Sequence, residues 1–191
     1  VTNVPGYSTE SVAEFVFAQL DEYERKVGVQ NARLKSGEDE SLVKKAAMGR
    51  ERFGKTIGII GLGNIGSKVV PSAVGDGMFT KIYDELKSDD EIRLLIETES
   101  RKRGMAILDE SRHKIVRSID EALDSDYITV HIPLNEGTRN YINAARIAKM
   151  KNGAVLINDS REGIVDENAV KEALESGKLM AYLTDVLEKD S

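Results

Sequence analysis

The chain has 191 residues, a formal net charge of −6 and no cysteine, and 40% of its residues are hydrophobic. This length suffices for one well-buried domain. The interspersed charges argue against a general binder of nucleic acid or anionic membranes, and the lack of cysteine excludes disulfides and thiolate chemistry. No apolar run approaches the ~20 residues that span a membrane, and the first residues lack a signal-peptide pattern. We therefore expect a cytoplasmic protein without a metal site, a membrane partner or a nucleic-acid partner.

The N-terminal region carries a helical pattern. From Ser8 or Thr9 onward, apolar residues recur at helical spacing, at Val12, Phe15, Val16, Leu20, Tyr23 and Val27. The spacing predicts one long amphipathic helix that continues past Gly28 and ends near Gly37. The polar stretch 38–54 is interpreted as a connector that contains a short helix around residues 42–48.

A glycine-rich turn follows the first predicted strand, Thr56–Ile60. The order of apolar strand, Gly61-x-Gly63-x-x-Gly66 and helical pattern is the context that a dinucleotide site requires. The first glycine permits the tight turn, the second lets the backbone approach a pyrophosphate, and the third lets the helix pack closely on the sheet. The helix, predicted over residues 65–73, then points free N–H groups at the anion. Pro71 should kink this helix or end it early.

Asp84 strengthens the dinucleotide interpretation. It follows the apolar stretch Phe79–Tyr83 and lies 18 positions after Gly66, near the roughly 20 expected for the acid that bonds the adenosine ribose. Its carboxylate would accept hydrogen bonds from ribose hydroxyls and would repel a 2′-phosphate. Because Glu85, Leu86 and Lys87 follow it directly and no arginine follows immediately, NAD is favoured over NADP.

The next region, residues 85–117, is unusually rich in charge. Ser88–Glu91 has the capping-box pattern and predicts the start of a solvated helix. Ser118–Glu121 repeats that pattern and opens a short helix. Met105–Leu108 and Lys114–Arg117 are two short strand candidates, and the pattern leaves open which of them continues the main sheet.

The rest of the chain alternates between strand and helix. Strands are predicted at Tyr127–Ile132, Ala154–Ile157 and Met180–Asp185. Helices are predicted at Ala144–Met150, after Asn143, and at Glu167–Ser176, capped by Asp166. This alternation predicts an α/β fold, a Rossmann-type doubly wound parallel sheet with helices on both faces. Residues 55–191 form this core, behind the N-terminal helix and arm (residues 1–37) and the connector. Ligands of such sheets bind at the carboxyl ends of the strands.

Ordered motifs extend along nearly the whole chain. They are Asn3-Val4-Pro5-Gly6, Gly61–Gly66, His131-Ile132-Pro133, Thr138–Asn143, Met150–Ala154, Asn158–Arg161, Val165–Glu167 and Thr184–Val186. In this order they resemble the D-isomer-specific 2-hydroxyacid dehydrogenases, a family that includes phosphoglycerate, glycerate and D-lactate dehydrogenases. The resemblance implies that residues 1–191 are a single NAD-binding domain. It implies an oxidoreductase that moves hydride between NAD(H) and a D-2-hydroxyacid, with a 3-phosphoglycerate-type acid as one candidate.

The resemblance also assigns roles by position. Arg161 matches the catalytic arginine, whose guanidinium would hold the substrate carboxylate and polarise the carbonyl. Asp190 stands where the family has the glutamate of its acid–base pair, and Asp185 would bond the nicotinamide carboxamide. The implied cofactor-binding residues are Gly61, Gly63, Asn64, Ile65, Gly66, Asp84, His131, Pro133, Thr138, Asn158, Ser160 and Asp185.

Departures from the family pattern limit the expected activity. Glu162 stands between Arg161 and Gly163, where the family has glycine directly after the arginine, and no histidine follows His131 to complete the acid–base pair. The substrate-binding domain is expected to be missing, and a start at Val1 indicates a processed protein or an excised domain. We therefore expect this chain to bind NAD and to turn over no substrate alone.

The N-terminal helix also predicts self-association. Family members pair through this domain, and Phe15, Phe17 and Tyr23 place apolar surface on more than one side of the helix, so we expect a homodimer. The alternative function is a NAD-sensing regulatory protein that keeps the fold without catalysis. The presence of Arg161 favours the enzyme.

Overall fold

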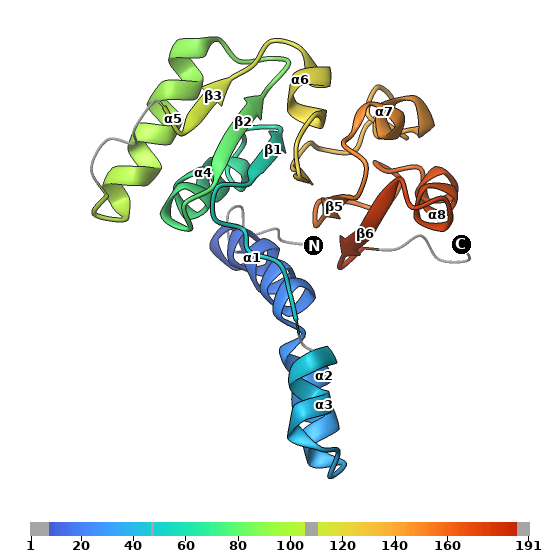
Figure 1. Cartoon of the computed structure of the whole chain (residues 1–191). Coiled ribbons are helices and arrows are strands. Elements are labelled where there is room, and N and C mark those ends of the chain that lie inside the picture. Colours follow the sequence, from blue (N-terminus) through green and yellow to red (C-terminus); the bar gives the residue numbers. More distant parts are fainter. Residues whose placement is uncertain (1–7, 47, 106–110, 187–191) are drawn as a thin grey trace, which may run out of the picture.

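The computed structural model describes residues 8–46, 48–105 and 111–186. Within them, six parallel strands form one sheet in the order β3-β2-β1-β4-β5-β6, which confirms the predicted Rossmann-type fold (Figure 1). The strands are β1 Thr56–Ile60, β2 Phe79–Tyr83, β3 His113–Ile115, β4 Tyr127–Val130, β5 Ala154–Asn158 and β6 Leu179–Thr184. The helices are α1 Thr9–Arg25, α2 Val27–Lys35, α3 Glu40–Ala46, α4 Gly66–Gly75, α5 Asp89–Lys102, α6 Ile119–Leu123, α7 Ala144–Lys149 and α8 Glu167–Glu175.

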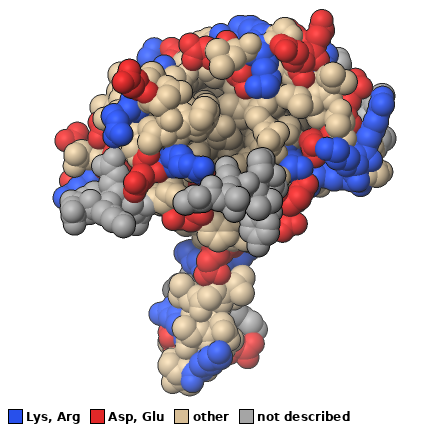
Figure 2. Space-filling view, turned by 180° about the vertical axis from the view of Figure 1, so that it is seen from behind, with Lys and Arg blue, Asp and Glu red and all other residues tan. Residues whose placement is uncertain are grey.

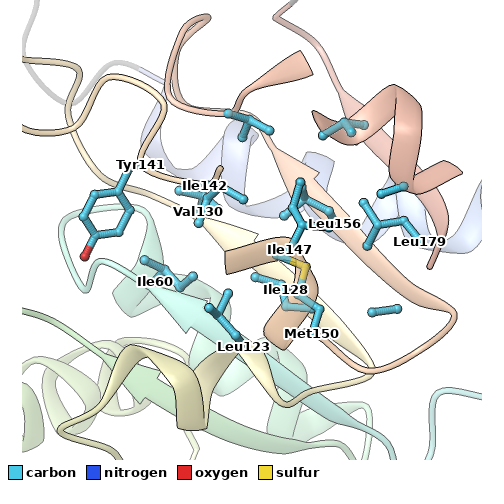
Figure 3. Close-up of a cluster of buried hydrophobic side chains, with 14 of the residues drawn as sticks. Ile60, Leu123, Ile128, Val130, Tyr141, Ile142, Ile147, Met150, Leu156 and Leu179 are labelled. Carbon is cyan, nitrogen blue, oxygen red and sulfur yellow. The ribbon is translucent and has the colours of Figure 1, made fainter. Parts of the chain in front are cut away.

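The central strands are apolar on both sides because helices cover both faces of the sheet. Ile57 and Ile59 of β1 belong to a core shared with α1, α4 and α5. Ile60 and, from β4 and β5, Ile128 and Leu156 belong to a second core shared with α6, α7 and α8 (Figure 3). The sheet is therefore held rigidly between two layers, and its carboxyl edge is left to the loops.

The predicted single N-terminal helix is wrong, because the structure has two helices there. Lys26 adopts a left-handed conformation (φ 52°, ψ 39°) that ends α1, and its N–H donates to the carbonyl of Glu22. The Glu22 carboxylate then accepts from the N–H of Gly28 at 3.0 Å, in the first turn of α2. A β-carbon at Gly28 would lie 2.8 Å from that carboxylate, so the glycine admits the local cap that redirects the chain.

The redirected chain projects from the domain as an arm formed by α2 and α3 (Figure 1). On the face of the molecule shown in Figure 2, lysine and arginine are interspersed with aspartate and glutamate. Among the residues that the structure describes, no helix is long and apolar enough to cross a membrane.

Pro71 does not end α4 early, contrary to one of the two outcomes predicted for it. The helix continues to Gly75, with Pro71 buried inside it. A proline in this place removes one N–H donor from the helical ladder. The hydroxyl of Ser72 bonds the carbonyl of Lys68 at 3.2 Å, and the helix then ends through the bond from Asp76 N–H to the Ser72 carbonyl. Burial against the core outweighs the local cost of the proline.

The charged region is also partly different from its prediction. The capping box that opens α5 is confirmed, with Ser88 and Glu91 bonding each other reciprocally. At α6 the Ser118 hydroxyl instead accepts from the N–H of Asp120, so the second capping box is wrong although Ser118 does cap the helix. Of the two strand candidates, the later one corresponds to β3, which pairs with β2. Most of the earlier candidate, residues 105–108, lies outside the described residues.

Candidate functional site

A cleft of about 500 Å³ lies at the carboxyl ends of β1 and β4, where the strand order of the sheet reverses. This is the switch point at which open α/β sheets bind ligands. The residues that line it are Ile60, Gly61, Gly63, Tyr83, Asp84, Glu85, Leu86, Lys87, His131, Ile132, Pro133, Asn135, Gly137, Thr138 and Tyr141. Six of the predicted cofactor residues thus meet in one place: Gly61, Gly63, Asp84, His131, Pro133 and Thr138.

The three glycines of the turn differ in what a side chain would meet. Gly61 has a φ of 91°, and a β-carbon on it would lie 2.7 Å from the carbonyl oxygen of His131. A β-carbon on Gly66 would lie 2.1 Å from the carbonyl oxygen of Gly61. A β-carbon on Gly63 would meet no described atom within 4 Å, because this glycine faces the open cleft. The first and third glycines close the turn, and the second leaves room for a ligand.

The start of α4 points toward this cleft from the glycine turn. Asn64 and Ile65 connect Gly63 to the helix, and Ile65 occupies the N-cap position. Among the described residues no side chain caps this end. The N–H groups of Ser67 and Lys68 donate to the carbonyls of Gly63 and Ile65 at 3.1 and 2.9 Å, so an anion would bind to the N–H groups that precede them, at Asn64 to Gly66.

Asp84 is tied directly to the glycine turn. Its Oδ2 accepts from the N–H of Leu62 at 2.8 Å, and its Oδ1 accepts from the N–H of Leu86 at 3.0 Å and of Lys87 at 3.1 Å. The Lys87 ammonium also lies 3.2 Å from Oδ2. The residue is only 8% exposed, yet it lines the cleft. Two loops from neighbouring strands are therefore fixed to one carboxylate.

This network keeps Asp84 ionised. Burial by itself raises the pKa of a carboxyl group, but the N–H groups of Leu62 and Leu86 and the Lys87 ammonium outweigh burial and hold the Asp84 pKa below its ordinary value. A carboxylate is a strong acceptor for vicinal ribose hydroxyls. Its negative charge, next to that of Glu85, disfavours a 2′-phosphate.

His131 follows β4, whose last residue is Val130, so the predicted strand end at Ile132 is wrong by two residues. Its Nε2 lies 2.9 Å from the Thr129 hydroxyl, and its Nδ1 is buried without a partner among the described residues. Burial lowers the pKa of His131 to about 4, so the ring is neutral at ordinary pH. A neutral, half-buried imidazole suits a wall of the cleft better than a proton donor.

The loop after β4 closes the other side of the cleft. The Thr138 hydroxyl donates to the Pro133 carbonyl at 2.6 Å and accepts from the N–H of Asn135 at 2.8 Å. The Arg146 guanidinium lies over the Tyr141 ring, 3.7 Å from the ring centroid. The Tyr141 hydroxyl donates to the Glu85 carboxylate at 3.4 Å. The cross-loop contact joins this loop to the end of β2.

Several lining residues were not predicted as site residues from the sequence. They are Ile60, Tyr83, Glu85, Leu86, Lys87, Ile132, Asn135, Gly137 and Tyr141. Four of them flank Asp84 in sequence, and Tyr141 lies in the motif that begins at Thr138. Their closeness in sequence to predicted site residues is the signal that could have identified these five.

Two other predicted residues organise the loop after β5. Asn158 is 1% exposed; its Oδ1 accepts from the N–H of Ser160 at 3.2 Å, and its Nδ2 donates to the carbonyl of Arg161 at 3.1 Å. The Ser160 hydroxyl donates to the Val130 carbonyl. Both side chains fix the loop to the sheet, and their contact with a cofactor stays a prediction.

Arg161 is exposed on that loop. Its guanidinium donates to the Ser160 carbonyl at 2.6 Å, and it pairs with no carboxylate of the described residues, including its neighbour Glu162. Asp185, also exposed, follows β6, whose end is bonded to β5 through the Thr184 hydroxyl and the Asn158 carbonyl at 2.6 Å. Neither Arg161 nor Asp185 lines the cleft described above, and Asp190 lies outside the described residues.

These observations fit a dinucleotide. An open backbone at Gly63, an uncapped helix start and a buried, ionised carboxylate match a pyrophosphate and a ribose, and the unpartnered Nδ1 of His131 can take a polar atom of a ligand. Within the described part of the chain, no group of three or more histidine, aspartate or glutamate residues is arranged to hold a metal ion.

Comparisons with known proteins give one family. Residues 17–191 match the family model for the D-isomer specific 2-hydroxyacid dehydrogenase, NAD binding domain. A hydroxypyruvate reductase of Thermotoga maritima is 36% identical over 98% of this chain and 54% of its own length. A D-3-phosphoglycerate dehydrogenase of Bacillus subtilis is 38% identical over 98% of this chain and 32% of its own.

Solved structures agree with this assignment. D-lactate dehydrogenase with NAD+ from Lactobacillus jensenii has a TM-score of 0.73 and 33% identity, over 98% of this chain and 51% of its own. The pyruvate reductase of Chlamydomonas reinhardtii has a TM-score of 0.79 and 34% identity, over 98% of this chain and 49% of its own. The chain thus spans about half, or less, of the length of these relatives.

Proposed function

Because the chain belongs to the D-isomer specific 2-hydroxyacid dehydrogenases, as their NAD-binding domain, we propose that it supplies one half of an active site that moves hydride between NAD(H) and a D-2-hydroxyacid or 2-oxoacid. The observation that carries this proposal is the bond from Leu62 N–H to Asp84. It joins the turn suited to the pyrophosphate to the acid suited to the ribose, so both recognition elements are preorganised in one cleft.

The cofactor would be held from one end of the sheet to the other. Gly63 and the start of α4 would bind the pyrophosphate, and Asp84 the adenosine ribose. His131, Pro133 and Thr138 would line the adenosine side of the cleft. Asp185 would accept from the nicotinamide carboxamide, on the loops that Asn158 and Ser160 hold in place. When bound, NAD supplies or accepts the hydride.

Arg161 is proposed as the catalytic residue of this half. Its guanidinium is exposed, donates to the Ser160 carbonyl and pairs with no carboxylate of the described residues. It can therefore bind a substrate carboxylate through two parallel hydrogen bonds. The same positive charge would polarise the carbonyl that receives the hydride. The proton that completes the reaction needs another group, because His131 is neutral and bonded to Thr129. We propose Asp190 as part of that acid–base pair.

Fluorescence titration of the 191-residue chain with NADH tests the binding half of this proposal. We expect saturable binding, stronger for NADH than for NADPH, and no oxidation of NADH when 2-oxoacids are added. The relatives are named for several acids, among them D-3-phosphoglycerate and D-lactate, so a panel of such acids is the right assay. No binding of NADH at millimolar concentration contradicts the proposal, and so does turnover by this chain alone.

We also propose that the chain forms a homodimer through α1 and the projecting arm. None of the α2 residues is buried, and Val29 and Leu34 on α2 are 52% and 51% exposed. Beside the arm, Phe15 and Tyr23 line an apolar groove between α1 and β6. Contiguous apolar surface of this kind is typical of an interface.

Analytical ultracentrifugation tests the dimer. We expect the wild-type chain to sediment as a dimer at micromolar concentration, and the double variant Val29→Glu/Leu34→Glu to sediment as a monomer. Because both side chains are exposed in the single chain, the variant should keep its circular dichroism spectrum. A wild-type monomer at micromolar concentration contradicts the proposal.

A further inference from the structure

Asp159 is an acidic side chain buried at the carboxyl end of β5, two residues before Arg161. It is only 5% exposed, and it does not line the cofactor cleft. Its carboxyl group faces α1 instead, where the amide Nε2 of Gln19 donates to Oδ1 at 2.9 Å. The pair joins positions 140 residues apart and ties α1 to the loop that carries Arg161.

Each group of this pair has one oxygen that is left over. Asp159 Oδ2 and Gln19 Oε1 are both buried, and neither has a hydrogen-bond partner among the described residues. The backbone N–H of Asp185 is near the Asp159 carboxyl group but leaves Oδ2 unsatisfied. Two oxygens without hydrogens cannot bond each other, and leaving both unsatisfied is costly. One proton on Oδ2 removes the problem, because a carboxylic acid and a primary amide can pair through two antiparallel hydrogen bonds.

The surrounding charges favour that proton. Asp159 faces groups from two elements. The neutral amide of Gln19 comes from α1, the phenol of Tyr182 comes from β6, and the carboxylate of Asp185 comes from the residue after β6. Burial and, to a lesser degree, the Asp185 carboxylate raise the pKa of Asp159. The Gln19 amide and the Asp185 backbone N–H lower it, and the net result is a pKa of about 6. On its own loop the Arg161 guanidinium is bonded to the Ser160 carbonyl.

We propose that Asp159 and Gln19 form a proton-dependent latch: the neutral acid holds α1 on the loop before Arg161, and ionisation loosens it. Asp159 is then a positioning residue for Arg161 and for Asp185, the two residues assigned above to the substrate and the nicotinamide. This part rests on the proposed function. Ionisation of Asp159 loosens the loop and places a buried negative charge beside the exposed Asp185 carboxylate, so binding at the nicotinamide end weakens as the pH rises.

The sign of the effect on stability follows from linkage. The raised pKa means that the folded chain keeps a proton which the unfolded chain has already released. The stability given by the neutral acid is fully present below about pH 4 and is lost as the pH rises through about 6. The lowered pKa of His131 makes the stability rise with pH over a similar range. Because the wild type and the variants all contain His131, this contribution cancels when their stabilities are compared.

Urea unfolding between pH 4 and pH 8 tests the latch without any cofactor. Asp159→Asn keeps the shape and the bond pattern of the neutral acid but cannot ionise. We expect the wild-type midpoint to fall relative to that of Asp159→Asn as the pH rises, with most of the change between pH 4 and pH 6 and little above that. The exposed Asp124→Asn is the matched control and should show no such divergence. Parallel profiles for the wild type and Asp159→Asn overturn the latch.

Two further measurements complete the test. Carbon-13 NMR should show one aspartate carboxyl that titrates near pH 6 in the wild type, disappears in Asp159→Asn and shifts in Gln19→Leu; titration of Asp159 below pH 4.5 overturns the proposal. The NADH dissociation constant should rise severalfold from pH 5 to pH 8 in the wild type and stay constant in Asp159→Asn. An equal rise in both proteins overturns the coupling to Arg161 and Asp185. No NADH binding at any pH instead contradicts the proposed function, while the unfolding data still judge the latch.

Discussion

Gly66→Ala is expected to lower the free energy of unfolding by about 2–3 kcal/mol and to abolish NADH binding, because the new β-carbon would lie 2.1 Å from the carbonyl oxygen of Gly61. That oxygen belongs to the backbone of the turn and cannot rotate away. The start of α4 must move instead, which displaces the N–H groups proposed to bind the pyrophosphate. Urea unfolding and NADH fluorescence titration measure the two effects.

Two alanine variants of nearby glycines separate folding from binding. Gly63→Ala meets no described atom within 4 Å, so stability should change by less than about 0.5 kcal/mol while NADH affinity falls by about tenfold or more. Gly75→Ala, at the other end of α4, makes only an ordinary 4.0 Å contact with Met105 and should leave both quantities unchanged. A Gly66→Ala protein as stable as Gly75→Ala would show that the turn is not sterically closed.

Local patterns predicted the parts of the molecule whose cause is local. The Gly61–Gly66 turn and Asp84 could be predicted because each depends on a strand, its end and a short spacing, and the structure joins them by the bond from Leu62 to Asp84. The helix break at Lys26 could not, because it depends on the Glu22 carboxylate turning back to Gly28 against a continuous apolar pattern.

The polar contacts of the β5 loop could not be predicted for a different reason. Asn158 and Ser160 are typical of the family motif, but the sequence does not show that their side chains bond the loop itself. The pairing of Gln19 with Asp159 spans 140 positions, and only the packing of α1 on the sheet brings the two together. The sequence can thus place a polar residue near a site at a strand end, but it cannot identify the residue's hydrogen-bond partner.

Asp84→Asn is expected to weaken NADH binding by about 10- to 100-fold and to raise the relative affinity for NADPH. An amide keeps one acceptor oxygen, so it cannot serve the ribose and the N–H groups of Leu62, Leu86 and Lys87 together. Loss of the charge also removes the repulsion of a 2′-phosphate and releases the Lys87 ammonium, which lies 3.2 Å from the carboxylate.

Lys87 is the one lysine or arginine among the described residues that line the cleft, so the gain for NADPH should depend on it. Asp84→Asn/Lys87→Gln should therefore keep the loss of NADH affinity and lose the gain for NADPH. Asp90→Asn, whose side chain is 95% exposed, is the matched control and should bind both cofactors as the wild type does. If Asp84→Asn binds NADH within twofold of the wild type while remaining folded, Asp84 is a structural clamp of the glycine turn and the ribose is recognised elsewhere.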